Sequence, residues 1–149
     1  MTTSITLAGP DDHARVMGLM ERNIAETGHD WDPVTRERAL APLLDGSPHG
    51  AIWLIGPVRA PLGYVLVSFG WSISLGGSEG WVDEVFIRPS VRRRGIGTEV
   101  LHAIAVALSK GGVKALHVRL PDTATVNQRF CERVGFAHQP DIRLMSDVF

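Results

Sequence analysis

The sequence of 149 residues predicts a single α/β (α+β) domain, with a mixed central sheet of six to seven strands flanked by about four helices. Strand-like and helical patterns follow one another in the order β α α β β β α β α β β. Residues 81–120 by themselves form a β–α–β unit, so the two strands of this unit run parallel. The hydrophobic content of 44% is sufficient for one folded core.

The first half of the chain supplies a strand, two helices and a further strand. The predicted elements are a strand at 4–7, helices at 12–27 and 33–45, and a strand at 51–55. The first helix ends at Gly28. The second begins with Asp32 as its cap and Pro33 in its first turn, and it ends before Gly46. The strand at 51–55 is a continuous apolar run, which is typical of a buried strand.

The second half supplies the remaining strands and two more helices. The predicted elements are strands at 62–75 and 81–87, a helix at 96–110, a strand at 115–120, a helix from 122 to 133, and a C-terminal hairpin within 136–149. Gly70 is expected to mark a bulge or bend in its strand. The glycines at 76 and 77 turn the chain, and those at 111 and 112 close the helix before them.

Residues 85–98, which read VFIRPSVRRRGIGT, carry the strongest functional signal. Strand-like sequence ends at Ile87, and three arginines precede Gly95 and Gly97 at the start of an apolar helix. Glycines allow close approach of the backbone to a ligand, and free N–H groups with the helix dipole attract an anion. The pattern predicts a phosphate-binding loop, while a solvated turn or a nucleic-acid patch is also compatible with the arginines. A dinucleotide-binding Rossmann turn is disfavoured because Val100 stands where it needs a third glycine.

The Arg-x-x-Gly-x-Gly sequence at 92–97 matches the acyl-CoA motif (Gln/Arg-x-x-Gly-x-Gly/Ala) of the GNAT superfamily of N-acyltransferases, which this chain resembles. The family places an acidic-apolar strand and an Arg/Asp-Pro turn before this motif, and residues 83–89 (DEVFIRP) fill that place. A later family block usually ends Tyr-x-x-x-Gly-Phe, and residues 131–136 (CERVGF) lie at the right distance. The resemblance covers residues 81–136 well and the N-terminal third by pattern alone.

The resemblance implies the GNAT fold, in which two central parallel strands splay apart and the pantetheine arm of acyl-CoA lies between them. Here those strands are residues 81–87 and 115–120. It also implies acetyl-CoA as co-substrate, with no metal, and a thioester carbonyl polarised by a backbone N–H near Phe86 or Ile87. The residues expected to bind acetyl-CoA are Val85, Phe86, Ile87, Arg92, Arg93, Arg94, Gly95, Ile96, Gly97, Thr98 and Asn127.

Asp83 and Glu84 are the candidates for the general base that removes a proton from the attacking amine. Neighbouring residues on a strand face opposite sides, so only one of them faces the acceptor. Some family members place the base four residues before the last apolar position of this strand, which corresponds to Asp83. The other carboxylate is then a solvated charge.

Cys131 and Asn127 mark the two departures from the family pattern. Cys131 stands where the family usually has a tyrosine that protonates the leaving thiolate. A thiol is a weak hydrogen-bond donor, so Cys131 is either a substitute acid or a small buried residue. The CoA-contacting asparagine of the family corresponds to Ala124, and Asn127 lies nearly one helical turn later, where it either replaces that asparagine or is a solvated residue.

The acceptor site is expected between the loop that joins the first two helices and the bend of the strand after Ser68. The acidic and aromatic residues there suit a cationic amine, although a polar helix connection gives the same composition. The residues concerned are Glu26, His29, Asp30, Trp31, Asp32, Trp71 and Ser72.

Composition restricts the function classes. The net charge is −1 with a pI near 6.6, so the chain has no overall attraction to nucleic acid. No stretch approaches the roughly 20 apolar residues of a membrane helix, and no signal peptide is visible. One cysteine excludes an internal disulfide and is typical of a reducing cytosol. The six histidines lack the spacing of zinc ligands.

We therefore expect a cytoplasmic N-acetyltransferase that transfers an acetyl group to a primary amine in a ternary complex. A non-catalytic acyl-CoA sensor or interaction module on the same fold is the alternative, and a nucleic-acid binder is a third. The sequence leaves the acceptor open among polyamines, aminoglycosides, amino acids, peptide N-termini and protein lysines. Relatives often dimerise through C-terminal strands, so a homodimer is one expectation for the oligomeric state, which is also left open.

Overall fold

The computed structural model describes residues 2–28, 30–120 and 125–149, and of residues 125–127 only the backbone. The chain divides into two compact units, Met1–Arg119 and Leu120–Phe149. The first unit contains a five-stranded sheet and three α-helices, and the second contains one α-helix and the C-terminal segment. That residues 1–149 form a single domain stays a prediction.

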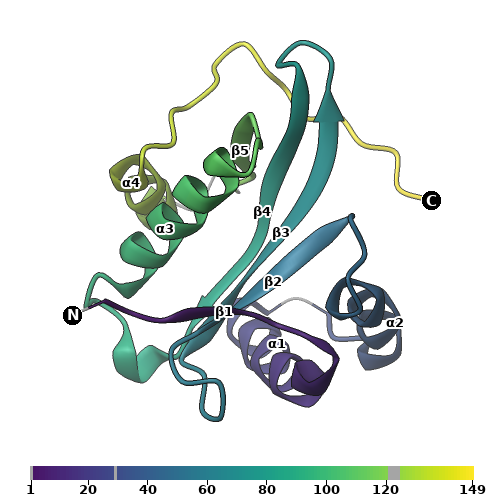
Figure 1. Ribbon diagram of the computed structural model, residues 1–149, viewed down its shortest axis with the longest axis vertical. Coiled ribbons are helices and arrows are strands. Elements are labelled where there is room, and N and C mark those ends of the chain that lie inside the picture. The colour runs from purple at the N-terminus through teal and green to yellow at the C-terminus, as the bar shows by residue number, and fades with distance from the viewer. Residues whose placement is uncertain (1, 29, 121–124) are drawn as a thin grey trace. The chain divides into compact units, whose positions relative to one another are not determined.

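The sheet has the strand order β1-β2-β3-β4-β5, which follows the order along the chain (Figure 1). The first four strands pair antiparallel, and β4 pairs with β5 in parallel, as the β–α–β unit predicts. The strands are β1 (Ile5–Leu7), β2 (Gly50–Ile55), β3 (Gly63–Ser72), β4 (Gly77–Ile87) and β5 (Ala115–Val118). The β3–β4 turn therefore lies at residues 73–76, and β4 begins four residues earlier than predicted.

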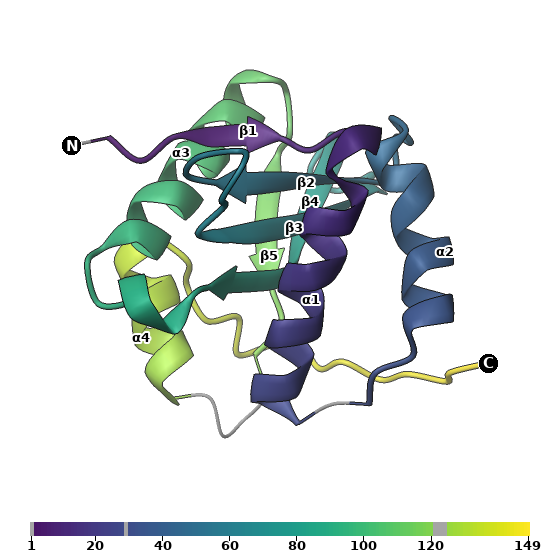
Figure 2. The same ribbon diagram turned by 90° about the horizontal axis from the view of Figure 1, so that it is seen from below.

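Helices cover both faces of this sheet. Helices α1 (His13–Thr27) and α2 (Pro33–Leu44) lie on one face, and α3 (Ile96–Lys110) lies on the other (Figures 1 and 2). Two short 3-10 helices, η1 (Pro10–Asp12) and η2 (Pro89–Val91), precede α1 and the phosphate-loop region. Helix α1 ends at Gly28 in the left-handed conformation, and the Asp32 side chain accepts the first N–H groups of α2, as predicted.

The main hydrophobic core lies between the sheet and the α1–α2 layer. Its buried members on the sheet include Ile52, Leu54, Tyr64 and Phe86, and its helical members are Val16, Leu19, Met20, Leu40 and Leu44. Helix α3 buries Val100, Leu101 and Ile104, which do not belong to that cluster. The sheet is therefore apolar on both faces, in agreement with the continuous apolar runs of its inner strands.

Strand β4 contains a bulge at Asp83. Leu66 pairs with Glu84 while the next residue, Val67, pairs with Val82, so Asp83 has no partner on β3. Of the bulge or bend expected at Gly70, the bulge is wrong, because Gly70 pairs regularly with Glu79, and the bend stays a prediction. A bulged residue bends its strand and redirects the side chains that follow, and here the redirected residues are those of the predicted site.

The parallel pairing of β4 with β5 ends directly before this bulge. It runs from Glu79 opposite Ala115 to Val82 opposite Val118. Beyond that point β4 continues to Ile87, and residues 83–87 have no β5 partner in the described part of the chain. The pairing therefore ends where β5 itself ends, and residues 83–87 of β4 extend beyond it. That the two central strands splay apart, as the resemblance implies, stays a prediction.

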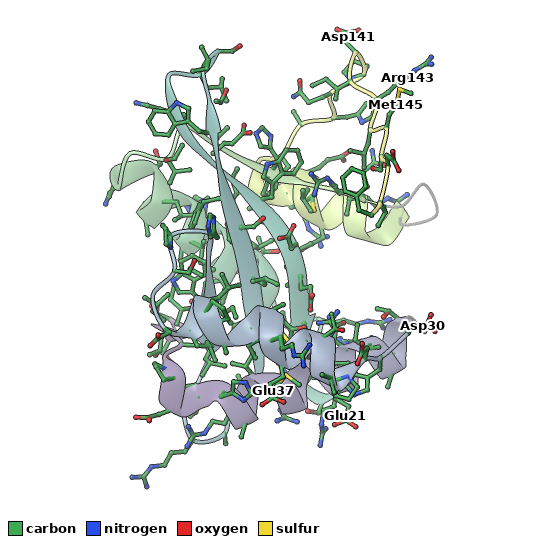
Figure 3. All side chains as sticks on the ribbon, turned by 90° about the vertical axis from the view of Figure 1, so that its right-hand side faces the viewer. Glu21, Asp30, Glu37, Asp141, Arg143 and Met145 are labelled. Carbon is green, nitrogen blue, oxygen red and sulfur yellow. The ribbon has the colours of Figure 1, made fainter. Side chains whose placement is uncertain are left out.

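The second unit consists of α4 (Thr125–Val134) and a segment without regular structure. Helix α4 ends at Gly135, whose φ of 117° is available to glycine and strained for other residues. No strand is present in residues 136–149, so the predicted hairpin is wrong and the sheet has five strands, fewer than the six to seven predicted. Apolar residues of this segment, such as Met145, are exposed (Figure 3). An apolar pattern makes a strand only where a neighbouring backbone completes its hydrogen bonds.

Within the described residues, no helix has the length and apolar character needed to cross a membrane.

Candidate active site

The predicted phosphate loop forms a tight turn before α3. Arg93 adopts a positive φ of 64°, and Gly95 lies in the left-handed region at 75°. The first intrahelical bond of α3 runs from the Glu99 N–H to the Gly95 carbonyl at 3.0 Å. The N–H groups of residues 96–98 therefore have no acceptor within the helix.

These features fit the pyrophosphate of a CoA molecule. Arg93, Arg94 and Gly95 are exposed, and the space around Gly95 is open. A Cβ at Gly95 would meet no atom within 4 Å, so a side chain would have space here. Glycine is favoured at this position because of the left-handed backbone conformation. Free N–H groups at a helix start combined with two exposed guanidinium groups bind an anion well. Residues 93–98 would thus hold the phosphates.

The side chain of Arg92 is directed elsewhere. Its two terminal nitrogens contact both carboxylate oxygens of Glu26, near the end of α1, at 2.6 and 2.7 Å. Its Nε donates to the Ile87 carbonyl at 2.7 Å, and its guanidinium carbon lies 5.6 Å from the centroid of the Phe86 ring. The hydrogen bonds from Arg92 lower the pKa of Glu26. Arg92 thus joins the phosphate loop, the end of β4 and helix α1.

The predicted acyl-CoA strand, residues 85–87, lies in the part of β4 that extends beyond its pairing with β5. Phe86 is buried in the core and Val85 and Ile87 are half-buried. Within the described residues, each of the three pairs with β3 and has no strand partner on its other side. This edge can therefore offer backbone groups to an extended ligand, as a further strand would.

Glu84 is the centre of a hydrogen-bonded network on the α1–α2 face. Its Oε1 accepts a 2.6 Å hydrogen bond from the hydroxyl of Tyr64, which is fully buried on β3. Nη1 of Arg36, on α2, lies 3.1 and 3.2 Å from the two Glu84 oxygens. Asn23 of α1 donates to the Tyr64 oxygen at 3.1 Å. Three elements therefore hold one carboxylate in a single position.

Burial raises the pKa of Tyr64 above its ordinary value, and the charge of Glu84 raises it further. Its phenol consequently remains a proton donor to Glu84 throughout the neutral range. Asp83, by contrast, is the exposed bulge residue directly before Glu84, and no hydrogen bond holds its side chain in the described structure.

Cys131 lies buried on α4, and burial raises the pKa of its thiol, with a smaller contribution from Glu132. The thiol is therefore protonated at neutral pH. Of Asn127 only the backbone within α4 is described, and Ala124 and the predicted start of this helix at residues 122–123 lie outside the described residues.

The residues predicted to bind the acceptor have diverse environments. Glu26 is paired with Arg92, Asp32 caps α2, and Ser72 accepts a hydrogen bond in the β3–β4 turn. Trp71 is exposed at that turn, and His29 lies outside the described residues. Trp31 is half-buried and stacks on Arg36, with 5.5 Å between guanidinium carbon and ring centroid.

Three members of the Glu84 network, Asn23, Arg36 and Tyr64, were missed by the sequence reasoning. Tyr64 is the only tyrosine of the chain and falls in an apolar strand, where a phenol needs a hydrogen-bond partner. That was the available signal. Arg36 and Asn23 are polar helix residues like many others, and only the tertiary fold brings them to Glu84.

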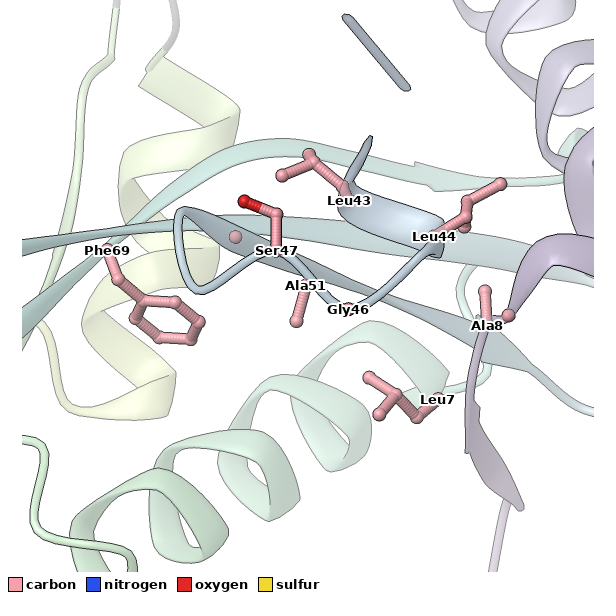
Figure 4. Close-up of a pocket in the computed structure, with 10 residues that line it drawn as sticks. Leu7, Ala8, Leu43, Leu44, Gly46, Ser47, Ala51 and Phe69 are labelled. Carbon is pink, nitrogen blue, oxygen red and sulfur yellow. The ribbon is translucent and has the colours of Figure 1, made fainter. Parts of the chain in front are cut away.

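A separate apolar cavity of about 460 Å³ lies between β1, the end of α2 and β3 (Figure 4). Its lining includes Leu7, Leu43, Ala51 and Phe69, and none of the predicted site residues. No group of three His, Cys, Asp or Glu side chains that could hold a metal ion is found among the described residues.

The profile of the Acetyltransferase (GNAT) family matches residues 17–136. The chain therefore belongs to the GNAT acetyltransferase family. A search of curated proteins finds no match.

Solved structures share the fold along nearly the whole chain. An integron cassette protein from the mobile metagenome of Cole Harbour Salt Marsh is 28% identical with a TM-score of 0.85, over 97% of this chain and 90% of that one. A possible acetyltransferase from Clostridium difficile 630 is 16% identical with a TM-score of 0.88, over 100% and 99% of the two chains. An aminoglycoside acetyltransferase from an uncultured soil metagenomic sample, solved with sisomicin, is 11% identical with a TM-score of 0.78, over 99% and 97%.

Proposed function

We propose that this protein is an N-acetyltransferase that transfers the acetyl group of acetyl-CoA to a primary amine in a ternary complex. The observation that carries the proposal is the position of Glu84. Its carboxylate is held by Tyr64 and Arg36 one residue after the bulge, in the part of β4 that extends beyond its pairing with β5. A fixed carboxylate beside an open strand edge suits a reaction that must remove a proton from an amine.

Glu84 is the better of the two candidates for the base. Among the described residues, only Arg36 donates to its Oε2, at 3.1 Å, so this oxygen can still accept a proton from an acceptor amine or from a water. Tyr64 and Arg36 fix the orientation of the carboxylate, and Asn23 fixes Tyr64. Asp83 lacks such support and would contribute negative charge that attracts the cationic amine.

The transfer itself needs little from the protein besides positioning. Acetyl-CoA supplies the acyl group: the acceptor nitrogen bonds to the carbonyl carbon, the carbon–sulfur bond breaks, and CoA leaves with the negative charge on sulfur. Glu84 takes the proton that the nitrogen loses, directly or through water. Backbone N–H groups at residues 86–87 polarise the carbonyl, and residues 93–98 with Arg93 and Arg94 hold the phosphates.

The test is release of free thiol from acetyl-CoA against a panel of amines, with wild-type protein and Glu84→Gln. We expect turnover with at least one amine, and a loss of roughly a hundredfold or more in kcat for Glu84→Gln, with CoA affinity retained. Glu37→Gln is the matched control, because Glu37 is an exposed carboxylate on α2 (Figure 3).

The same experiment separates the alternative function. A protein that binds CoA by calorimetry and releases no thiol with any amine would be an acyl-CoA sensor or interaction module. The chain contains one cysteine, which agrees with a reducing compartment, and we propose the cytoplasm as its location.

A further inference from the structure

Arg36 uses only one corner of its guanidinium group to hold Glu84. Both contacts to the carboxylate come from Nη1. The other two nitrogens, Nη2 and Nε, have no hydrogen-bond partner within the described structure. These two form the edge of a guanidinium that binds a carboxylate through two parallel hydrogen bonds.

Trp31 fixes the plane of this guanidinium. Its ring stacks on Arg36 at 5.5 Å, and it also packs against the main hydrophobic core. The Arg36 side chain remains 26% exposed and that of Glu84 21% exposed. A small molecule can therefore reach both groups, while partial burial strengthens their interactions with it.

The charges around this point have a definite pattern. Glu84 is a carboxylate, and Arg36 is a cation in direct contact with it. A ligand that suits both signs at once carries an ammonium and a carboxylate close together. In a free α-amino acid the two are separated by a single carbon. A polyamine or an aminoglycoside brings several positive charges and no negative one, so the Arg36 guanidinium disfavours it.

We infer that the acceptor is a free α-amino acid, with its ammonium at Glu84 and its carboxylate on the Nη2–Nε edge of Arg36. This inference rests on the proposed function, because it assigns the acceptor of that reaction. The bound ammonium first loses one proton to solvent water, and the resulting neutral nitrogen is the nucleophile, whose second proton Glu84 takes during the transfer. Arg36 then selects the substrate and positions the base.

The inference is tested by binding, without any acetyl transfer. Each of the twenty L-amino acids and its carboxamide is titrated calorimetrically into the full chain saturated with CoA. The carboxamide keeps the amine and the side chain and removes only the negative charge. We expect at least one amino acid to bind about tenfold or more tightly than its carboxamide.

Two variants show whether Arg36 causes the preference. Arg36→Gln is expected to bind the selected amino acid and its carboxamide within about threefold of each other. Arg38→Gln removes an equal charge from an exposed position on the same helix and should keep the full preference. Equal binding of all twenty pairs by the wild type, binding of none of them, or tighter binding of spermidine would each overturn the inference.

The outcomes also separate this inference from the proposed function. Acetylation of amines that lack a carboxylate, with no preference for amino acids, would refute the amino-acid acceptor. The proposed N-acetyltransferase activity would still be supported. Preferential binding of an amino acid, without acetyl transfer to any amine, would support an amino-acid site at Arg36 and Glu84. It would also refute the proposed N-acetyltransferase activity.

Discussion

The two terminal nitrogens of Arg92 lie 2.6 and 2.7 Å from the two carboxylate oxygens of Glu26, so the first arginine of the acyl-CoA motif is already bound to an acidic side chain. A bidentate pair of this kind uses the same donors that would bind a phosphate. Glu26 therefore competes with any anion for Arg92, and it ties the phosphate loop to the end of α1. Arg93 and Arg94, which are exposed, have no such partner within the described residues.

The first prediction follows from this competition. Glu26→Gln should tighten CoA binding about two- to fivefold, because the phosphates would no longer have to break the ion pair between Arg92 and Glu26. This factor corresponds to the free energy of about one exposed ion pair. Calorimetry with CoA measures the effect. Glu21→Gln is the control, because Glu21 is an exposed carboxylate on the same helix (Figure 3). Unchanged or weaker binding by Glu26→Gln alone would show that Arg92 serves only to hold the loop.

The effect of this pair depends on pH in a defined direction. Because the Arg92 hydrogen bonds lower the pKa of Glu26 below its ordinary 4.5, the pair stabilises the folded protein above that value. The stabilisation is lost as the pH falls through the lowered pKa. It amounts to less than about 1 kcal/mol, because both side chains are more than a third exposed. Melting curves of wild type and Glu26→Gln should therefore differ at neutral pH and converge in acid.

A second prediction concerns the phosphate loop. Gly97 is buried in the first turn of α3, so Gly97→Val would place a branched side chain where the phosphates are expected to approach the backbone. CoA affinity should fall by at least about tenfold, or 1.4 kcal/mol. Gly97→Ala serves as a milder variant if the valine lowers the melting temperature. A folded valine variant with wild-type CoA affinity would place the phosphates elsewhere.

Local sequence patterns predicted the elements and the glycine-opened loop, because both depend on neighbouring residues. Gly28, Asp32 and Gly95 each act within one turn of their own helix, and each does what its residue type predicts. The bulge is different, because Asp83 becomes an extra residue only through its register with β3. Gly63 is a similar case: a Cβ there would lie 2.0 Å from the Phe86 carbonyl oxygen of β4.

The candidate site divides in the same way. The sequence predicted that the base is one of two neighbouring carboxylates, and only tertiary contacts show that the surroundings of the two differ. Arg36 reaches Glu84 from 48 residues away and Tyr64 from 20 residues away, through side chains whose local sequence carries no sign of the pairing. The predicted C-terminal hairpin is wrong because a strand also needs a partner strand, and residues 136–149 have none within the described structure.

The third prediction tests the packing of α3 on the sheet. Ile104 is fully buried, so Ile104→Ala should lower the free energy of unfolding by roughly 2–5 kcal/mol, through lost burial and the cavity left behind. Denaturant unfolding measures this loss. Val106→Ala, at a position that is 38% exposed on the same helix, should cost much less. Equal costs for the two variants would mean that α3 does not use the Ile104 face for packing.

The last prediction concerns Cys131, which stands where the family usually has a tyrosine acid. Burial raises the pKa of its thiol, so the proton is present at neutral pH but is held more tightly than in water. A thiol is also a weaker and shorter donor than a phenol, and a CoA thiolate needs little protonation to leave. Cys131→Ala should therefore retain most of the turnover, with kcat within about threefold of the wild type, and lose some stability through the deleted sulfur. Cys131→Ser keeps a small donor and distinguishes packing from proton transfer. A loss of a hundredfold or more in Cys131→Ala, the scale of a missing general acid, at an unchanged melting temperature and without recovery in Cys131→Ser, whose hydroxyl is a far weaker acid, would instead make the thiol catalytic.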